Sequence, residues 1–173
     1  MTLRYPATPD VGHILVAVDP GKHYCGVALG WAGSGDNARI GMYVAGKVPS
    51  HKVRDWADAN YEHQDTLFWV AETPQKYKTR RSTHRDLDAL EAVLASLPPL
   101  VARWTPMEWK RNTPKAAHHA RVWEALTGFD EQRRMWGHWH GPDESHDVRD
   151  AIALWLFAVG RLGPGGPDPV LSK

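Results

Sequence analysis

The segment of residues 14–30, ILVAVDPGKHYCGVALG, constrains the fold of this chain more than any other. Its first five residues are apolar without alternation, which predicts a strand covered on both faces. Asp19-Pro20-Gly21 then interrupts the run with strong turn residues, and residues 24–29 resume as a second, antiparallel strand. Asp19 thus ends a central strand, where it either only organises the turn or projects from the edge of a sheet.

The remaining pattern predicts an α/β domain with a five-stranded mixed sheet flanked by helices, in which three antiparallel strands precede two parallel ones. We expect this domain to span residues 13–162, between a flexible arm of residues 1–12 and a flexible tail of residues 163–173. Further strands are expected at 39–48, 66–71 and 100–104. Helices are expected at 51–64, at 82–97, from Thr113-Pro114 to about Leu126 with Gly128 ending it, and from 142 or 145 to 161, while 130–140 is irregular or a short helix.

Composition excludes several classes of protein. The single cysteine, Cys25, rules out an internal disulfide and favours a reducing compartment. The first residues carry no apolar segment typical of a secretory signal, and no apolar run approaches the ~18 residues that a membrane span needs. A net charge of +1 does not mark a general nucleic-acid coat, so the distribution of charge carries more information than its sum.

Four carboxylates fall where they can share one site. Asp19 and Glu72 each end an apolar run, so parallel neighbouring strands would bring both to one edge of the sheet. Asp147 and Asp150 lie three residues apart on the last helix and so share one face of it. The apolar residues by which this helix packs continue along the same face. Buried carboxylates need a counter-charge, and oxygen ligands suit Mg²⁺ or Mn²⁺.

Each acid also has a simpler interpretation. Asp147 and Asp150 lie near a helix N-terminus, where the helix dipole favours acids in any protein. Glu72 could pair with a nearby base such as Lys76. The four residues together, in this order and in these contexts, favour a shared site.

Three motifs resemble those of the RuvC-type Holliday junction resolvases, nucleases of the RNase H-like superfamily, with phage-borne relatives the most similar. They are VAVDPG followed by a glycine-containing strand, WVAETP, and HDVRDAIALWL near the end. The resemblance covers about residues 14–161 and implies an RNase H-like fold. It implies that Asp19, Glu72, Asp147 and Asp150 hold two divalent ions, Mg²⁺ with Mn²⁺ able to substitute, in a two-metal hydrolysis. Some relatives have histidine at the place of Asp147, which makes the adjacent His146 an alternative ligand.

The resemblance also implies a biological role. It predicts a homodimer that resolves four-way or branched DNA by paired symmetric nicks, in recombination and repair, in the cytoplasm of a bacterial cell and of host or phage origin. The alternatives are another RNase H-like nuclease, acting on hybrids or as a debranching enzyme, and a non-catalytic junction-binding module. No membrane association is expected.

Two basic segments, residues 73–85 and residues 110–123, contain no acid and would border the carboxylates. Such segments can hold a polyanion beside a metal site, although many charged runs are only solvated surface. Tyr77 could stack on a splayed base or simply pack. By the resemblance, Lys110 and Lys115 match lysines that support cleavage, and Lys115 is assigned a catalytic role, although Thr-Pro precedes it where the family tends to have glycine and alanine. The predicted DNA contacts are Lys76, Tyr77, Lys78, Arg80, Arg81, Lys110, Arg111 and Lys115.

Overall fold

The structure is a computed structural model that describes residues 14–32, 40–61, 67–74, 84–126, 128–141 and 144–164. The predicted arm and all but the first two residues of the predicted tail lie outside these ranges. So does most of the first basic segment, including Lys76, Tyr77, Lys78, Arg80 and Arg81.

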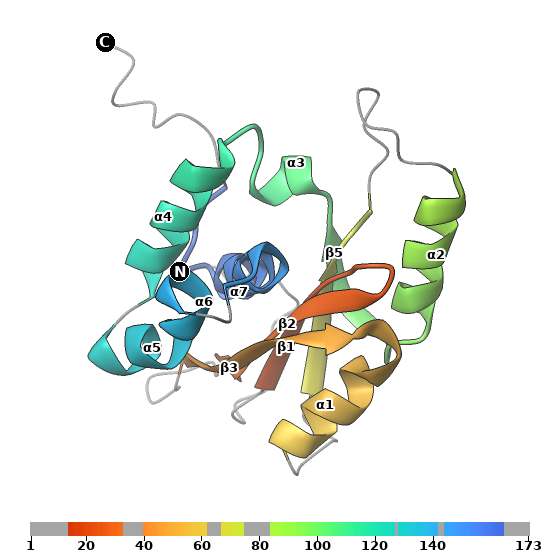
Figure 1. The fold of residues 1–173 in the computed structure, drawn as a ribbon, viewed down its shortest axis with the longest axis horizontal. Helices are drawn as coiled ribbons and strands as arrows, with labels where there is room; N and C mark the ends of the chain where they lie inside the picture. The colour runs from red at the N-terminus through yellow and green to blue at the C-terminus, as the bar shows by residue number, and fades with distance from the viewer. Residues whose placement is uncertain are drawn as a thin grey trace.

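The five predicted strands form one sheet in the order β3-β2-β1-β4-β5 (Figure 1). The first three strands are antiparallel neighbours, whereas β4 runs parallel to β1 and β5 parallel to β4, which confirms the predicted mixed sheet. The strand bounds are β1 Ile14–Asp19, β2 Tyr24–Ala32, β3 Ile40–Pro49, β4 Leu67–Glu72 and β5 Leu100–Trp104.

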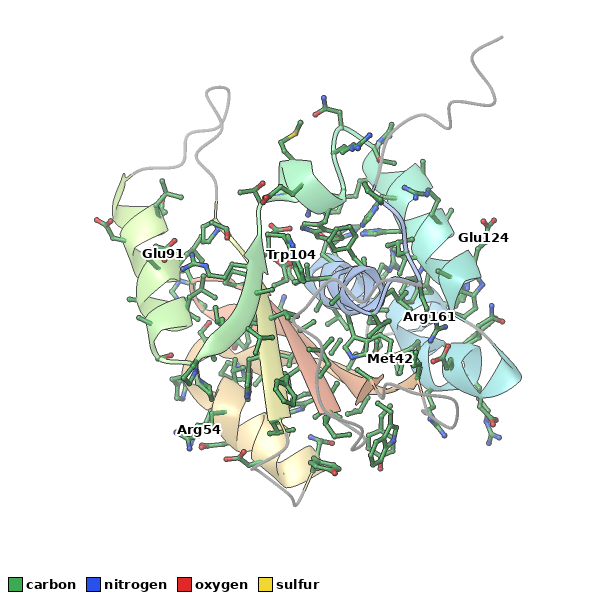
Figure 2. All side chains as sticks on the ribbon, turned by 180° about the vertical axis from the view of Figure 1, so that it is seen from behind. Met42, Arg54, Glu91, Trp104, Glu124 and Arg161 are labelled. Carbon is green, nitrogen blue, oxygen red and sulfur yellow. The ribbon has the colours of Figure 1, made fainter. Side chains whose placement is uncertain are left out.

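Helices cover both faces of the sheet (Figures 1 and 2). Alternate β1 residues point to opposite sides, so Val16 packs with α1 and α2 while Ala17 packs with α7. The first face carries η1 Ser50–Lys52, α1 Val53–Asn60 and α2 His84–Ala95; the second carries α4 Lys115–Ala125, α5 Gly128–Met135, α6 Gly137–His140 and α7 His146–Ala158. No helix within the described ranges is long and apolar enough to cross a membrane.

Some details of the helices differ from the prediction. Pro114 is the N-cap of α4 and provides no side-chain cap, so the expected Thr113 cap is wrong. Gly128 begins α5 instead of ending α4, and residues 130–140 belong to α5 and α6. The short helix α3, Pro106–Trp109, was not predicted, although Thr105 and Glu108 have the spacing of a capping box and are joined by a hydrogen bond of 2.9 Å between Oγ1 and Oε2.

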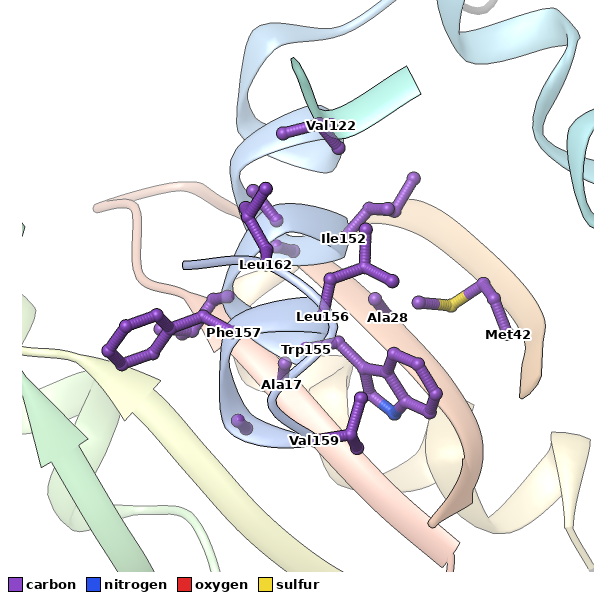
Figure 3. Close-up of a cluster of buried hydrophobic side chains, with 14 of the residues drawn as sticks. Ala17, Ala28, Met42, Val122, Ile152, Trp155, Leu156, Phe157, Val159 and Leu162 are labelled. Carbon is purple, nitrogen blue, oxygen red and sulfur yellow. The ribbon is translucent and has the colours of Figure 1, made fainter. Parts of the chain in front are cut away.

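Helix α7 lies at the centre of the second layer and is buried around its circumference. Ten of its thirteen residues are buried, so the single apolar stripe expected from the sequence is too narrow. The reason is that α4 and α6 cover the side of α7 that faces away from the sheet. Figure 3 shows Ile152, Leu156 and Phe157 of this helix among side chains from the sheet and from α4.

Two glycines of β2 allow α7 to lie directly on the sheet. A Cβ at Gly26 would stand 1.9 Å from the backbone oxygen of Asp147, and one at Gly30 would stand 2.6 Å from the Trp155 ring. The Trp155 indole also donates a 3.0 Å hydrogen bond to the Leu15 carbonyl oxygen of β1. The N-terminal turn of α7 is therefore fixed against the middle of the sheet.

We expect Gly26→Ala to lower the free energy of unfolding by about 1–3 kcal/mol, because the added methyl group overpacks the contact between β2 and α7. Urea denaturation would measure this change. Gly46→Ala is the matched control, because a Cβ there would lie 3.6 Å from the Trp56 ring, an ordinary contact. Equal unfolding midpoints for the two variants would contradict the prediction.

Candidate functional site

Asp19 and Glu72 lie at the same edge of the sheet, as the sequence predicted. Strands β1 and β4 are parallel, and their register pairs Val18 with Ala71, so the two acids occupy the next position on each strand. Asp19 also pairs with Gly26 of β2, the residue on which the backbone of Asp147 rests. The start of α7 therefore meets the sheet beside Asp19.

The Lys110 ammonium joins the carboxylates of the sheet to that of the helix. Its Nζ lies 3.1 Å from Glu72 Oε2 and 3.0 Å from Asp150 Oδ2. Burial alone would lower the pKa of Lys110, but the charges of Glu72 and Asp150 outweigh burial and raise it. Lys110 is thus a fixed cation among Asp19, Glu72 and Asp150, which we call the carboxylate site.

The negative charge of this site is only partly balanced. Burial, followed by the charges of Glu72 and Asp150, raises the pKa of Asp19 well above its ordinary value, and Lys110 offsets only part of this. Burial likewise raises the pKa of Glu72 against the opposing effect of Lys110. A further cation would stabilise the ionised form of both carboxylates.

Two hydrogen-bond donors to this site were not predicted. The Trp109 indole nitrogen donates to Glu72 Oε2 at 3.0 Å, and His119 Nε2 lies 3.2 Å from Asp150 Oδ1. Burial would raise the pKa of Asp150, but His119 and Lys110 together hold it at about 2. The sequence signal for His119 is its place one helical turn after Lys115 on α4.

His118, next to His119, is a buried imidazole whose two ring nitrogens have no hydrogen-bond partner among the described residues, although its Nε2 stands 3.9 Å from Asp150 Oδ1. Burial lowers its pKa to about 4, so it is neutral at physiological pH. Its ring packs edge-on against Trp109 at 5.2 Å. We therefore interpret His118 as a packing residue behind the carboxylate site.

Asp147 and His146 lie at the margin of the site. The Asp147 side chain is 48% exposed, and the Lys47 ammonium of β3 stands 3.6 Å from its carboxylate. His146 is exposed and stacks on the His119 ring with centroids 5.4 Å apart. The structure thus brings Asp19, Glu72 and Asp150 together around Lys110 and leaves Asp147 farther out.

The second basic segment divides between the site and the surface. Lys110 is a partner of the carboxylates, whereas Arg111 and Lys115 are exposed. Arg111 has a φ of 50°, in the left-handed region, where the chain turns between α3 and α4. Arg111 and Lys115 are therefore the residues of this segment that can meet a ligand from solution.

The three carboxylates of the site are chemically suited to bind a divalent cation. Among the described residues, no three His, Cys, Asp or Glu side chains already surround one ion position. Asp19, Glu72 and Asp150 nevertheless offer only carboxylate oxygens, which hard cations such as Mg²⁺ prefer. The raised pKa of Asp19 marks the charge that such an ion would balance, and the Lys110 ammonium lies where it would compete with that ion for Glu72 and Asp150.

Comparison with solved structures identifies the fold. The yeast mitochondrial Holliday junction resolvase Ydc2 superposes with a TM-score of 0.51 at 11% identity, over 91% of this chain and 83% of that one. RuvC from Thermus thermophilus gives a TM-score of 0.44 at 16% identity, over 87% of this chain and 99% of that one. The same RuvC in complex with a Holliday junction substrate gives 0.45 at 11% identity, with the same coverage.

The chain has an RNase H-like fold. The superposition on Ydc2 and the five-stranded sheet in the order 3-2-1-4-5 agree on this, which confirms the predicted fold class. No protein family and no curated protein matches the sequence. At this level of identity the similarity describes the architecture alone.

We expect Asp19→Asn to raise the melting temperature in EDTA by about 2–4 °C, the shift that about 1 kcal/mol produces in a domain of this size. The uncharged amide removes both the cost of burying Asp19 and its repulsion by Glu72 and Asp150. Differential scanning calorimetry would measure the change, with Asp88→Asn, on the exposed side of α2, as the control. A lower melting temperature for Asp19→Asn would contradict this charge assignment.

Proposed function

We propose that this protein is a metal-dependent endonuclease that resolves four-way or branched DNA by paired symmetric nicks. The observation that carries the proposal is the meeting of Asp19, Glu72 and Asp150 around Lys110 at one edge of an RNase H-like sheet. The architecture shared with the resolvase Ydc2 supports it. Paired nicking needs two active sites, so the proposal includes a homodimer.

In this proposal Asp19, Glu72 and Asp150 hold Mg²⁺, or Mn²⁺ in its place, and Asp147 completes the ligands from the start of α7. Two such ions supply an activated water and stabilise the leaving oxygen of a phosphodiester. Trp109 and His119 orient Glu72 and Asp150 through the hydrogen bonds described above. Orienting the ligands from behind in this way fixes their geometry before an ion binds.

The cations around the site have separate roles in the proposal. Lys110 keeps the carboxylates together in the absence of metal and, once displaced from them, is placed to meet a phosphate oxygen. Lys115 and Arg111 bind the DNA backbone from the exposed side. The predicted contacts between 76 and 81, which lie outside the described residues, would bind the same DNA strand in this proposal.

We expect wild-type protein with Mg²⁺ to nick a synthetic four-way junction symmetrically and to leave a linear duplex of matched sequence intact. Asp19→Asn should reduce the nicking rate by on the order of 100-fold or more, the usual scale when a group that stabilises transition-state charge is lost. Denaturing gels would measure both rates. Asp88→Asn, an exposed acid on α2, is the matched control.

The same assay separates the alternatives. Cleavage of an RNA–DNA hybrid or of a flap in preference to the junction would keep the carboxylate site but change the substrate. Junction binding without nicking in Mg²⁺ and Mn²⁺ would contradict the nuclease and favour a non-catalytic binding module. One observation favours this second candidate, because Lys110 already pairs with two of the three carboxylates.

Lys110→Met tests whether a metal ion and the Lys110 ammonium compete for the same carboxylates. In EDTA the variant should lose about 3 kcal/mol of stability, because Glu72 and Asp150 lose their buried partner. Mg²⁺ should stabilise it more than it stabilises wild type, because binding to the folded state alone adds stability by mass action. Denaturant titrations with and without Mg²⁺ would measure both effects.

Lys52→Met is the control for this variant, since Lys52 is exposed and pairs only with Asp55 at 3.0 Å in the described structure. If Mg²⁺ stabilised Lys110→Met and Lys52→Met by the same amount, this would contradict the proposal that the ion and the Lys110 ammonium compete for the same carboxylates.

A further inference from the structure

A cavity of about 610 Å³ opens beside the carboxylate site, between α4, α6 and the start of α7. These three helices lie next to one another in the second layer (Figure 1). Its volume is in the range of pockets that hold small organic ligands. None of the four carboxylates assigned to metal binding lines it, whereas His146, the alternative ligand, does.

The walls of this cavity are aromatic. Trp123 and Trp139 stand 5.3 Å apart at 44°, and His140 meets Trp123 edge-on at 5.3 Å. The stacked rings of His119 and His146 form the side nearest to the carboxylates. Flat rings at several orientations around an open space suit a planar, aromatic ligand.

The floor and rim determine what size and charge of ligand can enter. Ala116 and Ala120 of α4 line the cavity with small side chains and so leave room beside the aromatic rings. Lys115 lies exposed at the rim and supplies the positive charge there. The Arg149 guanidinium stands 5.4 Å from the centre of the Trp139 ring, but its charge is balanced by an ion pair with Glu144, which also lines the cavity. A ligand with an aromatic ring and an attached negative charge matches this arrangement.

His119 connects the cavity to the carboxylate site. One side of its ring lines the cavity, and its Nε2 lies 3.2 Å from Asp150 Oδ1. A ligand in the cavity therefore lies one side chain away from a residue that would hold the metal. A nucleotide matches this arrangement, because its base, which would occupy the cavity, is attached through the sugar to a phosphate, which would lie at the carboxylate site.

We propose that the cavity binds one unstacked nucleobase of the DNA strand whose phosphate lies at the carboxylate site. The inference rests on the proposed function, and it adds a binding site for a single base. A base in an intact duplex is stacked and paired and cannot enter, whereas a base at a branch point can unstack at a lower cost. The cavity thereby selects branched DNA over linear duplex.

Stacking makes the site tolerant of sequence. Every base has a π face that Trp123, Trp139 or His140 can contact, and such contacts strengthen binding without reading a particular base. Lys115 at the rim is placed to meet the phosphate attached to that base. This gives Lys115 a role in holding DNA that agrees with its predicted contact.

The test fills the cavity without disturbing the core. Ala120→Leu places a larger side chain in the cavity beside the rings, and Ala117→Leu is the matched control on an exposed part of α4 that does not line the cavity. Both substitutions keep a strong helix former. The probe is a four-way junction with one abasic nucleotide, moved through the positions on either side of the branch point, in Ca²⁺.

Fluorescence anisotropy would measure the dissociation constants. At one position, wild type and Ala117→Leu should bind the intact junction about tenfold more tightly than the abasic one, the effect of one lost base–aromatic contact. Ala120→Leu should bind both junctions equally, at the weaker level. A difference that persists in Ala120→Leu, or no difference in wild type at any position, would overturn the inference.

Two further measurements separate this inference from the proposed function. If wild type does not nick junctions in Mg²⁺ but shows the base dependence, the nuclease proposal fails and the base site stands. If nicking is normal and the base dependence is absent, the base site fails alone. A change in sedimentation coefficient for Ala120→Leu, without a change in DNA affinity, would assign the cavity to contacts between copies and overturn the inference.

Discussion

The structure depends on the contact between α7 and the two glycines of β2. Because Gly26 lacks a side chain, the backbone of α7 reaches the strand itself, and Gly30 leaves room for the Trp155 ring. Trp155 fixes the helix there through a hydrogen bond to the Leu15 carbonyl oxygen. This contact fixes the position of the first turns of α7 on the sheet, and therefore brings Asp150 close to Asp19 and Glu72. A core of alternating larger side chains would hold the helix farther away and separate these groups.

The carboxylate site depends on this contact, and in it Lys110 only partly compensates the unfavourable burial and mutual repulsion of the carboxylates. Asp19 lies close to Glu72 and Asp150, and its pKa is raised first by burial and then by the charges of these two residues. Lys110 offsets part of the repulsion, so the fold can form before any metal binds. Stability sacrificed in this way is typical of sites arranged for binding or catalysis, where a ligand supplies the missing charge.

Much of the site could be predicted because its signals are local. Asp19 and Glu72 were recognised from apolar runs that end in an acid, and parallel pairing of β1 with β4 brought them to one edge as expected. Lys110 was predicted as a DNA contact and as a match to a lysine that supports cleavage. Its ion pairs with Glu72 and Asp150 were not predicted, because these partners lie about 40 residues away on either side in the sequence. Asp147 was grouped with Asp150 by helical spacing, yet it lies half-exposed beside Lys47.

The sequence alone determined the order of the strands and of helices α1, α2, α4 and α7, the mixed sheet and the acids at its edge, because periodicity and turn residues act over a few positions. The tertiary structure decided which carboxylates share Lys110, why α7 is buried on all sides, and that His119 joins Asp150 to an aromatic cavity. These features depend on how α4 and α6 pack over α7. That packing is set by the fit of side chains distant in the chain, which no local pattern records.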